Sequence, residues 1–309
     1  MNQVRLARAL CALALLVCVG APLALADVTP NPTMLRDPDV NATHIVFVYA
    51  GDLWAVPRSG GVATPLASPP GAEANPRFSP DGKSIAFVGN YDGDRDLYTL
   101  ALEGGVPHRV TYHSTNETLA DWASDGSLIY YAFGQQTGQS HTELFTVSPK
   151  GGLPVQLPVP YGAKASIDAK GEWLAYTPWT RDNRTWKRYR GGLATDIWLF
   201  NLKTFESRKI TDWEGTDTEP MWHGDKLYYL SDREEPYRRN VWSFDPATGE
   251  HTQITRFEDY DIRYVAMGPG AKGEGEIVLQ NGASLYLLDL ASSKLSEVKV
   301  QIPGARPTL

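Results

Sequence analysis

The chain has 309 residues and a formal net charge of −7, with 36 acidic and 29 basic side chains and two cysteines. Because nucleic-acid-binding domains are normally basic, this acidic balance disfavours a nucleic-acid partner. Both cysteines, Cys11 and Cys18, lie in the first 26 residues, so the rest of the chain has no thiol to act as a nucleophile, bind zinc or form a disulfide.

Residues 1–26 are predicted to form a secretory signal peptide. Two arginines precede a short apolar run at positions 10–20, and small residues follow at positions 24–26. The run is too short for a membrane span, and no later segment reaches that length. We therefore expect cleavage near Ala26 and a secreted, periplasmic protein. Lipidation at Cys18 is a weaker alternative, because the bulky Val17 precedes it.

After the signal peptide, the sequence repeats a unit of four predicted strands. The clearest copy covers residues 75–111, where "SPDG" places Pro80 and Gly82 at turn positions that suit their backbone preferences. The other copies cover residues 38–67, 119–157, 165–211, 219–255 and 265–300. One aromatic residue marks the third strand of each copy, and these residues are separated by 44, 47, 53, 44 and 44 positions: Trp54, Tyr98, Phe145, Trp198, Trp242 and Tyr286.

This periodicity predicts the fold class. A four-stranded unit of about 40–50 residues is typical of a propeller blade. Several predicted strands are apolar at consecutive positions, as expected when both faces of a sheet are buried. We therefore predict an all-β fold, a six-bladed β-propeller of four-stranded antiparallel blades that fills residues 27–309. A β-sandwich is the rival interpretation, but it would not explain so regular a register.

A basic and aromatic segment interrupts the fourth repeat. Five basic side chains lie within ten residues, opposed there only by Asp182: Arg181, Arg184, Lys187, Arg188 and Arg190. The segment is predicted to be an enlarged loop at residues 180–194, between the second and third strands of its blade. Three interpretations remain open: a solvated loop, a contact with a protein or an anionic group, and a nucleic-acid site.

For the second interpretation, the candidate peptide- or anion-binding residues are Lys187, Arg188 and Arg190, because arginine suits bidentate recognition of a peptide carboxylate. Replacing Arg188 and Arg190 with alanine should leave thermal stability nearly unchanged, because exposed charges contribute little. The equivalent loop of the next blade, residues 233–239, contains an Arg–Arg pair that two glutamates partly offset.

No catalytic set is predicted. The sequence contains no G-x-S-x-G and no H-E-x-x-H motif, and its six histidines show no ligand spacing. The stretch "DGDRD" at 92–96 has the alternating aspartates of a calcium loop. However, Leu97 stands where that loop needs glycine, and a strand follows where it needs a helix. We therefore expect no metal and no cofactor, while carboxylate pairs for glycoside hydrolysis remain an open alternative.

Three stretches resemble the first propeller of the tricorn protease family: "PRFSPDGKSIAFVGNYDGDRDLY" (76–98), "WKRYRGG" followed by "DIWLFNL" (186–202), and "LYYLSDREE" (227–235). The repeat "NPRFSPDGKSIAF" (75–87) is also similar to the propeller repeat of TolB. The resemblance implies a place in a large serine protease with a second propeller, a PDZ-like module, a catalytic Ser/His region and hexameric assembly. It also implies that propellers act as gated passages and anchoring surfaces for peptides.

Three functional hypotheses follow. The leading one is a non-catalytic propeller of an exported tricorn-like serine protease, serving peptide access, peptide binding and assembly contacts with the remaining protease domains or a homo-oligomer. The alternative is a stand-alone, TolB-like periplasmic protein-interaction module. The third is a propeller hydrolase acting on glycans or esters, with its site at the mouth of the central channel.

Overall fold

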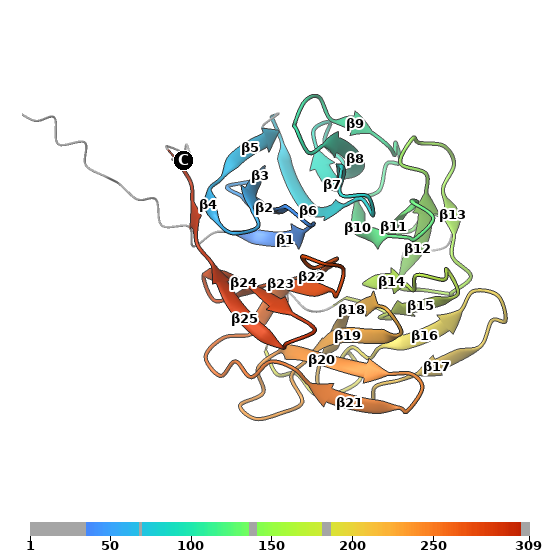
Figure 1. The fold of residues 1–309 in the computed structure, drawn as a ribbon. Helices are drawn as coiled ribbons and strands as arrows, with labels where there is room; N and C mark the ends of the chain where they lie inside the picture. Colours follow the sequence, from blue (N-terminus) through green and yellow to red (C-terminus); the bar gives the residue numbers. More distant parts are fainter. Residues whose placement is uncertain (1–34, 68–69, 136–140, 181–186, 304–309) are drawn as a thin grey trace, which may run out of the picture.

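The computed structural model describes residues 35–67, 70–135, 141–180 and 187–303, and these residues form a ring of β-sheets around a central axis (Figure 1). Six sheets have four antiparallel strands each, in the order in which the strands occur along the chain. No helix occurs in the described part of the chain. The prediction of a six-bladed all-β propeller is therefore confirmed. The predicted signal peptide, residues 1–26, lies outside the described residues.

Each blade is built from consecutive strands. Blade 1 contains β1 (Arg36–Val40), β2 (His44–Tyr49), β3 (Asp52–Pro57) and β5 (Thr64–Ala67). Blade 2 contains β6 (Ala72–Phe78), β7 (Ser84–Asn90), β8 (Asp96–Ala101) and β9 (His108–Arg109). Blade 3 contains β10 (Glu117–Trp122), β11 (Leu128–Phe133), β12 (Thr142–Val147) and β13 (Val155–Gln156).

The second half of the ring repeats this plan. Blade 4 contains β14 (Ala165–Ile167), β15 (Trp173–Tyr176), β16 (Trp198–Asn201) and β17 (Ser207–Lys209). Blade 5 contains β18 (Asp217–His223), β19 (Lys226–Ser231), β20 (Asn240–Asp245) and β21 (Glu250–Gln253). Blade 6 contains β22 (Ile262–Gly268), β23 (Glu276–Asn281), β24 (Ser284–Asp289) and β25 (Lys294–Val298).

The first strand of every blade faces the axis. These strands contact one another in cyclic order around the ring: β1, β6, β10, β14, β18, β22 and again β1. The aromatic residues that indicated the register all lie in third strands, where, for example, Trp54 pairs with Phe47 and Phe145 pairs with Tyr130. The rings of Phe145 and Tyr130 stack with centroids 5.3 Å apart.

The core lies in layers between neighbouring blades. One cluster joins Phe47 of blade 1 to Val278 of blade 6, and another joins Val46 of blade 1 to Phe87 of blade 2. Because neighbours cover both faces of a sheet, strands such as β7 are buried at five consecutive positions. Burial of each such large apolar side chain contributes about 1.5–3 kcal/mol.

The ring closes between blades 1 and 6 without a shared strand. The short strand β26 (Val300–Gln301) pairs in parallel with β4 (Gly61–Val62). On either side of this pair, Gly61 N donates to Lys299 O at 2.8 Å and Ala63 N to Gln301 O at 2.9 Å. Gly60, with φ +83°, is needed here because a Cβ atom would lie 2.5 Å from Lys299 O.

An ion pair reinforces the same seam. Arg58, which follows β3, donates from Nε to Oε1 of Glu276 in β23 at 2.6 Å, and the Glu276 side chain is almost fully buried. A buried carboxylate is costly unless it is paired, so this contact holds the seam in one arrangement.

Candidate functional site

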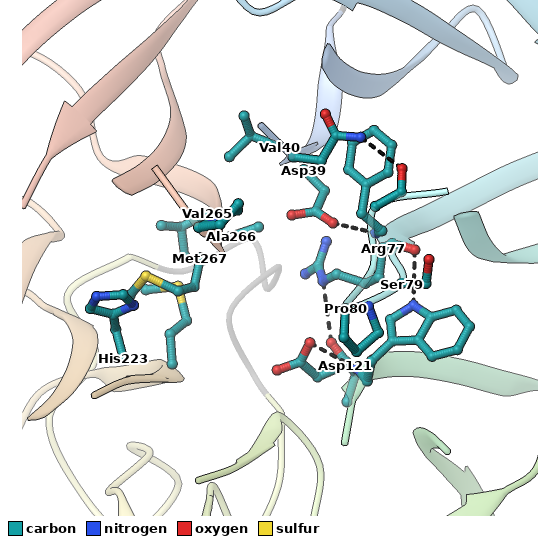
Figure 2. A pocket seen from close by; sticks show the side chains of 18 of the residues that line it. Asp39, Val40, Arg77, Ser79, Pro80, Asp121, His223, Val265, Ala266 and Met267 are labelled. Carbon is teal, nitrogen blue, oxygen red and sulfur yellow. Dashed lines mark hydrogen bonds between the residues drawn. The ribbon is translucent and has the colours of Figure 1, made fainter. Parts of the chain in front are cut away.

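The axial cavity, a space of about 600 Å³, is lined by residues of the inner strands of all six blades and by the turns that follow some of them. Figure 2 shows two kinds of wall facing each other across it. Asp39, Arg77 and Asp121 lie on one side, and Val265, Ala266 and Met267 lie on the other. Asp39, Arg77 and Asp121 come from blades 1, 2 and 3, and the three apolar residues come from blade 6, so only the closed propeller brings the two walls together.

Each inner strand has a last apolar residue that pairs with the second strand of its blade. The residue directly before it occupies an equivalent position in all six blades. We call these six residues the axial ring: Asp39, Arg77, Asp121, Ser166, Met221 and Ala266. Blades 1–4 supply its polar members and blades 5 and 6 its apolar members. The axial ring is therefore divided into a polar half and an apolar half.

Backbone bulges orient these side chains. The pairing of β1, β6, β10, β18 and β22 with their second strands shifts register within each strand. At three of the bulges a non-glycine residue has positive φ and precedes a proline: Asp37 (47°), Asn75 (50°) and Glu219 (52°). A bulge changes the direction of the following side chains. Proline is tolerated because the first strand is an edge strand.

Arg77 lies between the two aspartates, but backbone carbonyls accept its hydrogen bonds. Its Nη1 donates to Pro76 O at 3.0 Å and its Nε to Ala120 O at 3.3 Å. The backbone oxygen of Arg77 in turn accepts a hydrogen bond from Trp122 Nε1 at 3.0 Å. Among the described residues, no ion pair within 4.0 Å joins Arg77 to Asp39 or Asp121.

The two aspartates of the polar half have perturbed acidity. Asp39 is 4% exposed, and its Oδ2 accepts a hydrogen bond from Phe78 N at 2.5 Å. Burial raises the pKa of Asp39 to about 7, although the charge of Arg77 opposes this shift. Burial also raises the pKa of Asp121 above its ordinary value, against the opposing effects of Arg77 and of hydrogen bonds from Trp122 N and the Ser166 hydroxyl. Negative charge at this wall is thus incompletely compensated.

A second charged group lies beside the axial ring. Lys164, directly before β14, forms an ion pair with Glu219 of β18 at 2.7 Å, and both side chains are largely buried. The charge of Lys164 also lowers the pKa of Asp37 in blade 1, across the axis, although burial raises that pKa more strongly. Lys164 therefore links acidic groups of two other blades.

The two members of the apolar half, Met221 and Ala266, carry no charge, although Glu219 of β18 also lines the cavity. Met221, Val265 and Ala266 are buried there, and Met267 is half-buried with its side chain in the cavity. His223 lies beside Met267 in Figure 2. Methionine side chains adapt to differently shaped apolar groups, so this wall suits side chains of more than one shape.

The sequence-predicted residues Lys187, Arg188 and Arg190 lie outside the axial cavity. No strand occurs among the described residues between β15 and β16, and residues 181–186 of this segment, including Arg181 and Arg184, lie outside the described residues. Lys187 Nζ lies 3.5 Å from Asp261 Oδ2. Arg188 is exposed and has a φ of 54°. The binding roles of Lys187, Arg188 and Arg190 stay predictions.

Arg190 is held against blade 5. Its Nη1 donates to Glu214 Oε1 at 2.9 Å, and its guanidinium lies 4.9 Å from the ring centroid of Trp213 and 4.7 Å from that of Tyr237. These two rings are nearly parallel to each other. Because cation–π contacts occupy its planar faces, Arg190 already has an intramolecular role that the sequence pattern did not reveal.

Sequence reasoning did not identify the residues of the axial cavity. A signal was present: three repeats begin with an acidic or amide residue followed by proline, at Asp37, Asn75 and Glu219. Aligning the repeats on these prolines would have placed Asp39 and Arg77 at equivalent positions. The stretch tested for calcium is engaged differently, because Arg109 binds both Asp92 at 2.9 Å and Asp96 at 2.6 Å.

Two further properties of the described residues bear on function. No set of three or more His, Cys, Asp or Glu side chains in this part of the chain is arranged to hold a metal ion. Likewise, none of its segments forms a helix of the length and apolarity required to cross a membrane.

Comparison with known proteins identifies clear relatives. The family model described as "Tricorn protease N-terminal beta propeller domain" matches residues 32–294. A tricorn protease homolog of Saccharolobus solfataricus is 28% identical over 279 residues, which cover 87% of this chain and 25% of the relative. Tricorn protease homolog 1 of Streptomyces coelicolor is 26% identical over 283 residues, which cover 90% of this chain and 26% of the relative.

A solved structure agrees with these matches. The crystal structure of the tricorn protease superposes with a TM-score of 0.74 at 26% identity, covering 88% of this chain and 27% of that chain. The chain thus spans about a quarter of the length of the curated relatives it matches.

Proposed function

The chain belongs to the family of tricorn protease N-terminal β-propeller domains, and on this premise we propose that it is the non-catalytic propeller of an exported tricorn-like serine protease. In this role the propeller admits or binds peptides through its axial cavity. Loops on its surface contact the remaining protease domains or further copies of the chain.

The axial cavity is the observation that carries the peptide role. Its volume of about 600 Å³ lies within the range of sites that enclose small ligands. A peptide offers polar backbone groups and apolar side chains at once. The polar half of the axial ring can bind the former, and the apolar half can contact the latter.

The basic loop supports the assembly role. Arg188 and Lys187 are exposed, and Arg190 attaches the segment to blade 5. A loop that is held by contacts of Arg190 and Lys187 and exposed at Arg188 loses little conformational entropy when it binds a protein partner. We therefore assign Lys187 and Arg188 to contacts with acidic groups of a peptide or protein.

Peptide binding can be tested by blocking the axial cavity. The probe is the hexapeptide Leu-Ala-Leu-Gly-Ala-Leu with a fluorescent label at its C-terminus, measured by anisotropy with the full chain. Met267→Trp fills the cavity, whereas Val106→Trp adds the same side chain at a position that is 93% exposed. We expect at least about tenfold weaker binding in the first variant and no change in the control. Equal binding in both variants, or no binding by the wild type, would contradict the peptide role.

Membership of a larger protease has its own test. The native gene product, isolated from its host with an antibody to this region, should have an intact mass several times that of this chain. A mass of about 31 kDa, roughly that expected after removal of the signal peptide, would instead favour the stand-alone interaction module.

A further inference from the structure

The axial cavity has the charge pattern of a site for a cation. Charged side chains of both signs lie within it or beside it, and five are acidic and three basic: Asp37, Asp39, Asp81, Asp121 and Glu219, with Arg36, Arg77 and Lys164. Lys164 is already paired with Glu219. Arg36 acts on Asp37, so the positive charge that acts on Asp39 and Asp121 is that of Arg77.

Arg77 does not neutralise these carboxylates directly. Its guanidinium donates hydrogen bonds to the carbonyl oxygens of Pro76 and Ala120. In Figure 2 the carboxyl groups of Asp39 and Asp121 extend toward the cavity on either side of its guanidinium. A second cation in the cavity beside these carboxyl groups would donate charge-assisted hydrogen bonds to them in a site of low dielectric constant, where such bonds are strongest.

The opposite wall restricts which cation fits. Met221, Val265, Ala266 and Met267 form an apolar surface facing the two aspartates. A suitable ligand therefore carries an apolar group close to its positive charge. The first residue of a peptide has this composition, because its ammonium group and its side chain leave the same Cα atom. A lysine side chain does not, because its ammonium group is the end of a flexible stem.

From these observations, and resting on the proposed peptide role, we propose that the axial cavity recognises the amino terminus of a peptide with an apolar first residue. Asp39 and Asp121 accept hydrogen bonds from the ammonium group, which has three donors. The first side chain packs against Met221 and Met267. The incoming charge also offsets the burial that raises the pKa of Asp39 to about 7.

The test compares matched peptides with the full chain by isothermal titration calorimetry. The first is Leu-Ala-Leu-Gly-Ala-Leu with a free amino terminus, and the second is the same peptide with an acetylated amino terminus. A third begins with glycine in place of leucine, and a fourth is acetylated and contains lysine at its second position. We expect acetylation to weaken binding at least about tenfold and the glycine change to weaken it about three- to tenfold. The acetylated lysine peptide should bind no more tightly than the acetylated parent.

Variants assign the effect to the aspartates. Asp121→Asn should reduce the affinity for the free peptide to that of the acetylated one and leave the acetylated peptide unaffected. Asp225→Asn is the matched control, because Asp225 is 92% exposed in its side chain and lies outside the cavity. Circular dichroism checks that both variants fold. If Asp121→Asn does not fold, the comparison of free and acetylated peptides on the wild-type chain still decides whether the cavity recognises the amino terminus.

Failure of this inference differs from failure of the peptide role. If free and acetylated peptides bind equally, and Met267→Trp abolishes binding of both, the cavity takes peptides but does not recognise their amino terminus. Equally tight binding of the acetylated lysine peptide and the free peptide would identify a lysine side chain as the ligand and overturn the inference. If no peptide binds, the proposed peptide role fails together with it.

Discussion

Arg77 and Arg190 show how differently two basic side chains serve the same molecule. Arg190 belongs to the densest basic stretch of the sequence, yet its guanidinium lies against Trp213 and Tyr237 on the surface. Arg77 has no other basic residue within five positions in the sequence, yet it lies in the axial cavity between two aspartates from the adjacent blades. Basic residues that are close in sequence thus mark a surface loop, whereas the cavity gathers residues about 40 positions apart.

The surface loop and the axial cavity also differ in how strongly solvent screens a charge. Water screens the ion pair between Arg190 and Glu214, because both side chains are at least 40% exposed. In the axial cavity, low exposure removes that screening, and burial raises the pKa of both Asp39 and Asp121. Changes to charge should therefore have large, pH-dependent effects in the cavity and small effects in the loop.

The largest effect is expected for Arg77→Met. Removing the guanidinium leaves Asp39 and Asp121 without their nearest positive charge, which should cost about 2–3 kcal/mol at pH 8 and lower the melting temperature by roughly 5–8 °C. At pH 5, below the raised pKa of Asp39, this carboxyl group can take up a proton instead, so the loss should be smaller. Calorimetry at the two pH values measures the difference. An equal loss at both would show that Arg77 acts through packing rather than charge.

For each titrating group, a smaller effect is expected from pH alone. Burial raises the pKa of Asp39, Glu73 and Glu117 to about 7 each. Between their ordinary pKa values and about pH 7, the folded state retains protons that the unfolded state has lost. Stability should therefore fall as pH rises through this range, by the order of 1 kcal/mol per group. Melting curves from pH 5 to 8 test this, and Asp39→Asn should reduce the slope. A melting temperature that rises across this range would contradict the assignment.

The next effect concerns the surface loop. Arg190→Ala removes the contacts with Trp213, Tyr237 and Glu214, so the melting temperature should fall by roughly 2 °C. This refines the expectation from the sequence, which treated Arg190 and Arg188 alike. Differential scanning fluorimetry resolves a change of this size. No change at all would mean that these contacts contribute nothing in solution.

The smallest effect is expected for Arg188→Ala, the matched control two residues away in the sequence. Its side chain is exposed, so the melting temperature should change by less than roughly 1 °C. Binding of an acidic partner should nevertheless weaken if Arg188 contacts it. A fall comparable to that of Arg190→Ala would show that the loop depends structurally on both residues.

The sequence predicted the fold because its signals repeat. Residues such as Trp54 and Trp242 recur at equivalent positions, and apolar runs such as the buried residues 85–89 indicate blades that are covered on both faces. The turn at Gly82 was predictable for a local reason, and its φ of +69° agrees with that reason.

The site was harder to predict because its determinants are not local. Residues before proline usually prefer extended backbone, so the positive φ of Asp37 and Asn75 could not be predicted from propensity. These bulges orient Asp39 and Arg77 toward the axis. The anchoring of Arg190 was equally hidden, because its partner Tyr237 is 47 positions away in the next blade.

The seam between blades 1 and 6 has a consequence for how the molecule is made. Because every blade uses only its own stretch of chain, blades 1–5 can form in order as the ribosome releases them. Until Val300 and Gln301 reach β4, however, the nascent protein is an open crescent with the apolar side of blade 1 uncovered. The interval between synthesis of residue 67 and synthesis of residue 301 is therefore the period in which this protein most needs a chaperone.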